Sequence, residues 1–304
     1  MVRLSYLIAA AALSSLPTAL AGTPSPGCGK DPTLTSPDAY NLTVNGKTRD
    51  FYVRLPADYD SGHAYKLIFT FHALGGTAEQ VIAGTDGYLP WYGLPAADAD
   101  AAVSGDGGGG GETAIYIAAQ GLKNDAEFGG QMPGWANVDG EDLGLVDAIL
   151  ERIEVDLCVD QEHRYSTGFS YGGAMSYALA CDRSSLFRAV AVLSGGPMSG
   201  CEGGDGSPVA YYGQHGVSDQ VLPMALGREL RDRFVANNGC VVKEAMEPVA
   251  GSGTHEKTVY EGCTHPVTFV AFDGDHTPQP MDGDADQTYA PEETWEFFSQ
   301  FAQT

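Results

Sequence analysis

Short apolar runs alternate along this chain with longer segments in which apolar residues recur at helical spacing. Buried strands are predicted where the run is short and mostly apolar, at residues 66–71, 114–119, 164–169, 188–193, 208–212 and 267–272. Residues 141–156 predict a helix, because one helical face collects Val146, Ile149, Leu150 and Ile153. Further helices are predicted at residues 173–181, 222–236 and 292–301. Strands that alternate with helices favour a mainly parallel sheet covered on both faces, an α/β fold.

Turn-forming residues mark two further segments. Residues 40–44 and 48–55 flank Asn45-Gly46, which predicts a β-hairpin because Asn-Gly favours a two-residue hairpin loop. Residues 104–112 contain a run of consecutive glycines, and such a backbone does not easily hold one conformation. We expect a mobile surface loop there rather than a phosphate-binding loop, since no Lys-Ser/Thr pair follows and no helix begins at its end.

The N-terminus has the pattern of a secretory signal peptide. Arg3 precedes an apolar stretch at residues 4–13, and Ala19-Leu20-Ala21 forms a small-x-small cleavage site. The stretch is shorter than the ~20 residues that span a bilayer. We therefore expect residues 1–21 to be removed and the protein to be secreted. Residues 22–304 are expected to form a single catalytic domain with no appended binding module.

The chain is strongly acidic, with 16 Lys and Arg against 40 Asp and Glu and a formal net charge of −24. Such a field repels nucleic acid and anionic membranes, and it disfavours a strongly anionic substrate. We expect a monomer that binds neither nucleic acid nor membrane.

Six cysteines predict disulfides in a secreted chain: Cys28, Cys158, Cys181, Cys201, Cys240 and Cys263. The pairing is open, although Cys240 and Cys263 are favoured as one pair because Cys240 follows a predicted helix and Cys263 precedes a predicted strand. Asn41 begins the sequon Asn41-Leu42-Thr43 and is a candidate glycosylation site. An acidic stretch at residues 282–286 lacks the glycine and preceding helix of a calcium loop, so no metal and no cofactor is expected.

The GFSYG pentapeptide at residues 168–172 lies between a predicted strand and a predicted helix. In that setting G-x-S-x-G is typical of a nucleophile elbow, which raises the serine hydroxyl at the end of a sheet. Ser170 is therefore the predicted nucleophile. The alternative is a serine in an ordinary glycine-rich turn.

A serine nucleophile needs a base, and ligands of open α/β sheets bind beyond the carboxyl ends of the strands. His276 follows the strand predicted at residues 267–272, whereas His265 precedes it and belongs to the opposite edge. His276 is therefore the predicted base, and His215, which also follows a strand, is the second candidate.

The acidic residue of the triad should come after a strand that follows the elbow unit, and it should precede the catalytic histidine in the chain. Asp219 meets both conditions, since it follows the strand at residues 208–212. The oxyanion hole needs two backbone N–H groups, one from Tyr171 after the nucleophile and one from the loop after an early strand. Residues 72–76 are that loop, with Ala73 or Leu74 as donor.

These motifs together resemble the secreted fungal feruloyl esterases of types C and D. This family is related to carbohydrate esterase family 1 and to the extracellular polyhydroxybutyrate depolymerases. The resemblance covers nearly all of residues 22–304 and is carried by Gly27-Cys28-Gly29-Lys30, Val44-Asn45-Gly46-Lys47, Trp135-Ala136-Asn137, residues 156–160, 168–173 and 193–196, His215-Gly216 with Asp219, and His265-Pro266.

The resemblance implies an α/β-hydrolase fold and the release of ferulate and related hydroxycinnamates from arabinose on plant-wall xylan. It also implies a Ser170, Asp219 and His276 triad. Two positions depart from the family pattern, since Ala73 stands where an aromatic residue often follows the loop histidine and Tyr171 where tryptophan is common. These departures leave the substrate preference open.

Other functions fit the same scaffold. One alternative is an acetylxylan esterase or a polyester depolymerase, and another is a non-catalytic recognition protein of the hydrolase fold. A feruloyl site needs apolar walls for the cinnamoyl ring. The candidates are Tyr171, Trp135, Trp91, Tyr92 and the loop residue His72.

Overall fold

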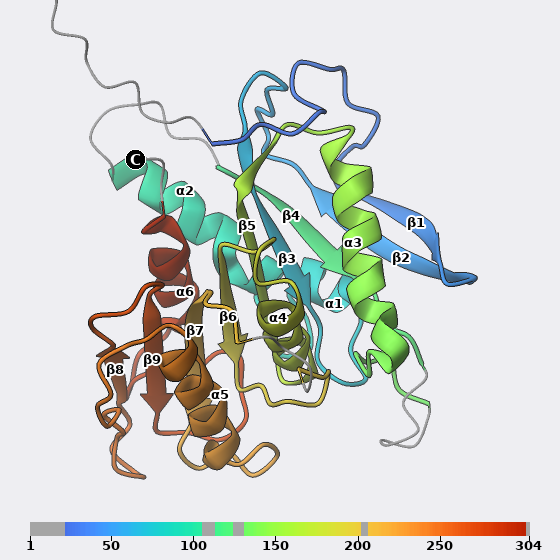
Figure 1. Ribbon diagram of the computed structural model, residues 1–304. Helices are drawn as coiled ribbons and strands as arrows, with labels where there is room; N and C mark the ends of the chain where they lie inside the picture. Colours follow the sequence, from blue (N-terminus) through green and yellow to red (C-terminus); the bar gives the residue numbers. More distant parts are fainter. Residues whose placement is uncertain (1–21, 105–112, 124–130, 202–205, 302–304) are drawn as a thin grey trace, which may run out of the picture.

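The computed structural model describes residues 22–104, 113–123, 131–201 and 206–301. The predicted signal peptide at residues 1–21 and residues 105–112 of the glycine-rich loop lie outside the described residues. In the described ranges one sheet takes the order β1-β2-β4-β3-β5-β6-β7-β9-β8 (Figure 1). The strands are β1 (Asp38–Val44), β2 (Lys47–Arg54), β3 (Tyr65–Phe71), β4 (Ala114–Ala119), β5 (Val159–Phe169), β6 (Ala189–Leu193), β7 (Ala210–Gly216), β8 (His255–Val259) and β9 (Val267–Phe272).

The sheet is mainly parallel, as the alternating pattern predicts. Strands β4, β3, β5, β6, β7 and β9 pair in parallel, while the β1–β2 hairpin and β8 are antiparallel additions at the two edges. The predicted hairpin is confirmed, and its two turn residues, Asn45 and Gly46, have φ angles of 50° and 75°. Positive φ at both positions is what a tight two-residue hairpin loop requires.

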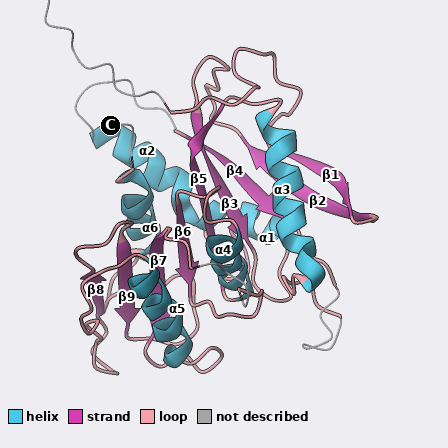
Figure 2. Cartoon of the chain, in the orientation of Figure 1, coloured by secondary structure: helices cyan, strands magenta, loops and turns pink. Residues whose placement is uncertain are grey.

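Helices cover both faces of the sheet (Figures 1 and 2). One face carries the three helices α3 (Glu141–Glu154), α4 (Tyr171–Asp182) and α5 (Met224–Asn237). The other carries α1 (Ala78–Ala83), α2 (Leu94–Ser104) and α6 (Ala290–Ser299). Each layer buries its own apolar cluster against the sheet, so the inner strands, such as β4 and β9, are buried on both sides.

The direction of the strands places the candidate chemistry at one edge. Phe71 ends β3, Phe169 ends β5, Gly216 ends β7 and Phe272 ends β9. Because parallel strands bring their carboxyl ends to the same edge, the loops that follow them converge there. The predicted triad and oxyanion-hole residues lie in these loops or at the start of α4, whereas the pocket candidates Trp91, Tyr92 and Trp135 belong to other segments.

Three disulfides join the six cysteines: Cys28–Cys158, Cys181–Cys201 and Cys240–Cys263. The last pair is the one favoured from the sequence, and it is confirmed. The candidate glycosylation residue Asn41 is exposed on the edge strand β1.

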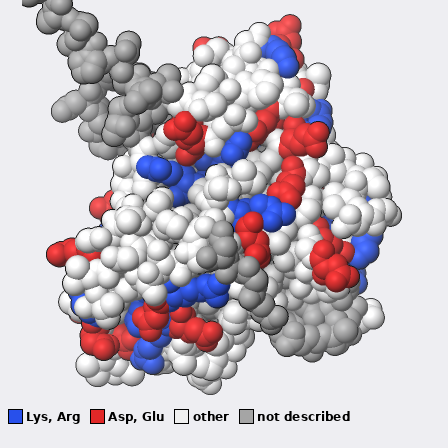
Figure 3. Space-filling model, viewed as in Figure 1, with Lys and Arg blue, Asp and Glu red and all other residues white. Residues whose placement is uncertain are grey.

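Charged side chains are spread over the surface. On the face covered by α3, α4 and α5, acidic and basic groups lie next to one another in small clusters (Figure 3). Among the described residues, no helix is long and apolar enough to cross a membrane. Within the same residues, no three His, Cys, Asp or Glu side chains gather in a way that could hold a metal ion.

Candidate active site

The nucleophile elbow is a strained turn at Ser170, between β5 and α4. Its backbone angles, φ 57° and ψ −116°, are rare for a residue that has a side chain. A Cβ on Gly172 would lie 2.0 Å from the carbonyl oxygen of Phe71, and one on Gly168 would lie 2.4 Å from the backbone of Gly172. Both glycines of the motif are therefore required by close backbone contacts, which leave Ser170 half-buried at the end of the sheet.

His276 and Asp219 form a hydrogen-bonded pair beside this elbow. The Nδ1–H of His276 donates to Oδ2 of Asp219 at 2.7 Å, and the Asp219 side chain is fully buried. The imidazole packs on the ring of Phe169, which directly precedes Ser170, with 4.5 Å between ring centroids. Nε2 of His276 is buried and makes no hydrogen bond to any described residue. A neutral ring with its proton on Nδ1 keeps a lone pair on Nε2 that can accept a proton.

The environment of Asp219 keeps its carboxylate charged. Its Oδ1 accepts hydrogen bonds from the backbone N–H groups of Val221 and Leu222, at 2.9 and 2.8 Å. Burial raises the pKa of this carboxyl, but the donors from His276, Leu222 and Val221 together lower it more, and the pKa lies below its ordinary value. A charged Asp219 holds His276 in the Nδ1–H tautomer and favours the imidazolium that forms after proton transfer.

His215, the second candidate base, also lies close to Asp219. Its Nε2–H donates to the carbonyl of Leu222 at 2.7 Å, and this nitrogen is 3.5 Å from Oδ2 of Asp219. The buried ring packs against the backbone of α5 at Gly227, and burial lowers its pKa. The hydrogen bond to Leu222 uses the proton on Nε2, so His215 braces the turn that carries Asp219.

The loop after β3 presents its peptides in fixed directions. The N–H of Ala73 donates to the hydroxyl of Tyr88 at 2.8 Å, so it already has a partner. The carbonyl of Ala73 accepts from Nδ1–H of His72 at 2.7 Å and from the N–H of Gly76 at 3.0 Å. In a trans peptide the next N–H points opposite to that carbonyl. The N–H of Leu74 thus points away from His72, and it donates to no described residue.

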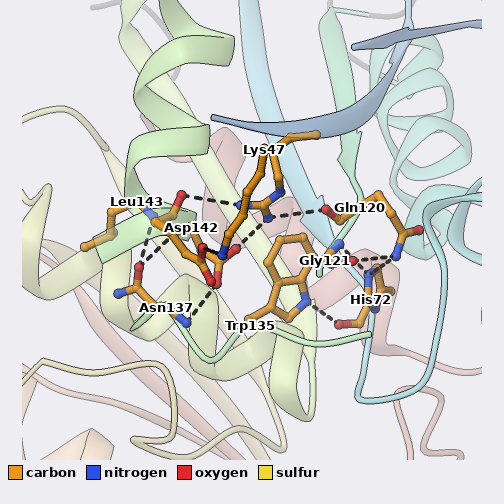
Figure 4. Close-up of polar contacts among 10 residues, drawn as sticks. Lys47, His72, Gln120, Gly121, Trp135, Asn137, Asp142 and Leu143 are labelled. Atoms are coloured by element: carbon orange, nitrogen blue, oxygen red, sulfur yellow. Dashed lines mark hydrogen bonds and ion pairs between the residues drawn. The ribbon is translucent and has the colours of Figure 1, made fainter. Parts of the chain in front are cut away.

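His72 and Trp135 lie behind this loop and are fully buried. The indole Nε1–H of Trp135 donates to the carbonyl of His72 at 2.7 Å, and Nε2 of His72 accepts from the N–H of Gly121 at 3.0 Å (Figure 4). Burial lowers the pKa of His72 to about 4, which keeps it neutral and able to accept that bond. The structure therefore places both side chains in support of the loop, away from any exposed wall.

Asn137 completes the motif that begins at Trp135. Its Oδ1 accepts from the N–H groups of Asp142 and Leu143, both at 3.1 Å, at the start of α3 (Figure 4). Its amide nitrogen donates to the carbonyl of Ser199 at 2.9 Å. The motif thus joins the loop after β3 to the first turn of α3 and to the loop after β6.

The sequence matches curated fungal proteins over nearly its whole length. It is 44% identical over 295 residues to feruloyl esterase D of Neurospora crassa, which covers 95% of this chain and 94% of that protein. It is 45% identical over 291 residues to feruloyl esterase C of Emericella nidulans, with 93% and 97% covered. The chain belongs to the fungal feruloyl esterase C/D family. The enzyme class expected from the sequence, a carboxylic ester hydrolase, is thereby confirmed.

Solved structures confirm the α/β-hydrolase fold of this feruloyl esterase family member. An acetyl xylan esterase from Aspergillus awamori superimposes with a TM-score of 0.56 at 15% identity, covering 86% of this chain and 99% of that one. A carbohydrate esterase family 1 ferulic acid esterase from Anaeromyces mucronatus gives 0.53 at 17% identity, with 91% and 95% covered. No family model matches the chain.

The other aromatic candidates of this family member are mostly buried. Trp91 and Tyr92 are 4% and 6% exposed, and Tyr171 is 2% exposed. Trp91 forms part of the lining of a groove of about 740 Å³, together with Gln279 and Met281 of the loop that follows His276. The sequence therefore named aromatic residues near the site, but the structure gives them little surface for a ligand.

Three residues near the site were not singled out from the sequence. Tyr88 binds the loop after β3, as described above. Met132 and Val221 are 42% and 62% exposed; Met132 lies over Gly75, and Val221 follows Asp219 by two residues. Nothing in the local pattern marks these positions, because their neighbours at the site are distant in the sequence.

Proposed function

We propose that this protein is a secreted serine esterase that releases ferulic acid and related hydroxycinnamates from arabinoxylan of plant cell walls. Ser170 is the nucleophile, His276 the general base and Asp219 the acid that orients it. The observation that carries the proposal is the buried, unpaired Nε2 of His276, held by Asp219 and packed on the residue before Ser170.

The reaction proceeds through an acyl-enzyme. His276 Nε2 takes the proton of Ser170 as Oγ attacks the ester carbonyl, and the oxyanion binds the N–H groups of Leu74 and Tyr171. The imidazolium gives its proton to the departing sugar oxygen, which leaves the acyl group on Ser170. A water molecule then attacks with His276 as base, and the acid product and free Ser170 are regenerated.

The acyl group determines the choice among ester hydrolases. A cinnamoyl ring that buries ~150 Å² gains about 3–4 kcal/mol from apolar contact, and an acetyl group gains far less. Exposed Met132 and Val221, with half-buried Leu74, offer apolar surface near the elbow. The names of the curated relatives favour the same acyl group. An acetylxylan esterase or polyester depolymerase stays the alternative, and a non-catalytic role does not explain the strained elbow.

The cellular setting follows from the same features. We infer that residues 1–21 are a cleaved signal peptide and that the mature protein is an extracellular monomer with one catalytic domain. Three disulfides suit an oxidising compartment. Asn41 is exposed and fits a glycan acceptor. The substrate of the protein is feruloylated arabinoxylan or its oligosaccharides, and the reaction uses no cofactor or metal.

Initial rates test the proposal most directly. The wild type should hydrolyse methyl ferulate with a kcat/KM about 10²-fold or more above that for a matched short aliphatic ester, because only the aromatic acyl group gains the apolar contact. Ser170→Ala should lose on the order of 10⁴–10⁶ in kcat on every ester. A serine-directed phosphonate should label Ser170, as read by peptide mass spectrometry.

Three outcomes would change the assignment. Faster hydrolysis of acetylxylan than of methyl ferulate would replace the feruloyl proposal with the acetylxylan esterase. An active Ser170→Ala variant, or a phosphonate adduct on another residue, would remove Ser170 from its role. A wild type inactive on all the esters would favour the recognition protein.

A further inference from the structure

The turn at residues 88–93 has an unusual backbone next to the candidate active site. Trp91, Tyr92 and Gly93 have φ angles of 53°, 59° and 74°, so three successive residues lie in the left-handed region. For two bulky aromatic residues this conformation is strained, and it persists only where surrounding contacts compensate for it. The contacts of Tyr92 and Tyr88 identify what this turn holds in place.

The Tyr92 hydroxyl bridges the ends of the two strands that carry the catalytic loops. It donates to the carbonyl of Phe71 at 2.6 Å and accepts from the N–H of Phe169 at 3.0 Å. Phe71 is the last residue of β3 and Phe169 the last residue of β5. The loop with Leu74 begins directly after the first, and Ser170 directly after the second. One hydroxyl therefore links both halves of the site.

Tyr88 fixes the loop itself. Its hydroxyl accepts the N–H of Ala73 at 2.8 Å, and its ring packs edge-on against that of Tyr92, with 5.5 Å between centroids. Both tyrosines are buried, at 7% and 6% exposure. A phenol can donate and accept at once, so neither hydroxyl is replaceable by the apolar edge of a phenylalanine ring. Removing the Tyr92 hydroxyl would take a partner from two buried backbone groups.

We propose that Tyr92 and Tyr88 are positioning residues that set the place of the Leu74 N–H relative to Ser170. This rests on the proposed ester hydrolysis and adds two residues that contact no reacting atom. Displacement of catalytic groups by about 1 Å can cost on the order of 10²-fold in rate. The effect should therefore appear in kcat more than in KM, since ester binding does not require the exact distance between loop and nucleophile.

Tyr59 provides a matched control at the other end of the sheet. Its hydroxyl also accepts a backbone N–H, that of Cys158, at 2.8 Å. Cys158 directly precedes β5, at the end of that strand opposite to Ser170. Tyr59→Phe removes one such bond, as Tyr88→Phe does, and should lower thermal stability about as much as Tyr88→Phe, but it leaves the site untouched.

The test compares Tyr92→Phe, Tyr88→Phe and Tyr59→Phe on methyl ferulate and on a short aliphatic ester. Tyr92→Phe should lower kcat about 10- to 100-fold on both esters with KM within about twofold, and it should slow phosphonate labelling of Ser170 by a similar factor. Tyr88→Phe should act in the same direction. Tyr59→Phe should keep kcat within about twofold of the wild type, with a loss of Tm similar to that of Tyr88→Phe.

The proposal is overturned if Tyr92→Phe keeps wild-type kcat, or if Tyr59→Phe loses as much kcat as Tyr92→Phe. Should Tyr92→Phe fail to fold by circular dichroism, Tyr88→Phe alone decides. Failure of the proposed function looks different, because the wild type itself would then be inactive on the esters. A wild type active only on the aliphatic ester removes the feruloyl assignment and leaves this comparison intact.

Discussion

At the scale of single residues, the proposed chemistry depends on one nitrogen atom, Nε2 of His276. The groups that hold its ring have defined partners: Nδ1 binds Asp219, Asp219 binds two backbone N–H groups, and His215 binds Leu222. Nε2 is buried without a partner among the described residues, a costly state in an ordinary core. The role proposed for this nitrogen, as proton acceptor for Ser170, accounts for that state.

His276→Gln should lower kcat by about 10⁴-fold or more while the protein still folds, because the amide can keep a bond to Asp219 but cannot take the serine proton. The matched control is His265→Gln, just before β9 at the opposite edge of the sheet, which should keep kcat within about twofold. Steady-state kinetics on a short aliphatic ester measure both. Loss of activity in His265→Gln with an active His276→Gln would mean that the site lies at the other edge.

Much of this site could be predicted from strand polarity. Ser170, Asp219 and His276 each follow a recognisable strand. The parallel direction of these strands was therefore enough to predict that the three residues lie at the same edge of the sheet. The reason for proposing Leu74 rather than Ala73 as donor could not be read from the sequence, because the Ala73 N–H is bonded to the hydroxyl of Tyr88, which comes from a turn with no periodic pattern. The burial of Trp135 could not be predicted from the sequence either, because an indole side chain is found both in pocket walls and in protein cores.

At the scale of elements, the unit of β5, elbow and α4 is held by backbone contacts that only glycine allows. A Cβ added to Gly172 would lie 2.0 and 2.8 Å from the carbonyl oxygens of Phe71 and His72. These are backbone atoms of β3 and the following loop, so they cannot rotate away as a flexible side chain could. These close contacts therefore fix the position of the first turn of α4 against the loop after β3.

Gly172→Ala should push these two elements apart, destabilising the fold by at least about 2–3 kcal/mol and lowering Tm by roughly 5 °C or more. Gly144→Ala is the control, because it lies inside α3 and its Cβ would be 3.6 Å from Val44, an ordinary contact. Alanine there should raise stability by about 0.5–1 kcal/mol. Differential scanning calorimetry compares the two, and equal Tm values would show that the close contact at Gly172 is not rigid.

Elements with a strong pattern were predicted well, and elements without one were missed. The bounds of β4 and β9 coincide with their apolar runs, since both strands are buried on two faces. The edge strand β8, with sequence HEKTV, has too few apolar residues to stand out. Helix α1 is only six residues long, although its capping box of Thr77 and Gln80 was a usable signal. Helix α2 is rich in alanine and shows no apolar stripe.

At the scale of the whole molecule, the fold disfavours the charged form of two buried histidines, His72 and His215, inside a strongly acidic protein. His72 accepts a backbone N–H at its Nε2, and burial lowers its pKa from 6.5 to about 4. Burial also lowers the pKa of His215. In the unfolded chain both rings take up protons near their ordinary pKa. Acid therefore favours the unfolded state through the same two residues that brace the loop after β3 and the Asp219 turn.

The consequence is a loss of stability on mild acidification that His72 should largely set. Below pH 6.5 His72 is protonated in the unfolded chain, whereas in the folded protein it is protonated only near pH 4. The free energy of unfolding therefore falls as the pH falls from 6.5 to about 4. Between pH 7 and pH 5 this residue alone should lower the free energy of unfolding by about 2 kcal/mol.

Urea unfolding of the wild type and of His72→Gln at both pH values measures this loss. The variant is less stable at pH 7, but the gap should narrow by about 2 kcal/mol at pH 5, whereas His63→Gln, at an exposed position, should parallel the wild type. A gap that stays constant between the two pH values would mean that the folded protein accepts a proton at His72 and that the bond to Gly121 does not require the neutral ring.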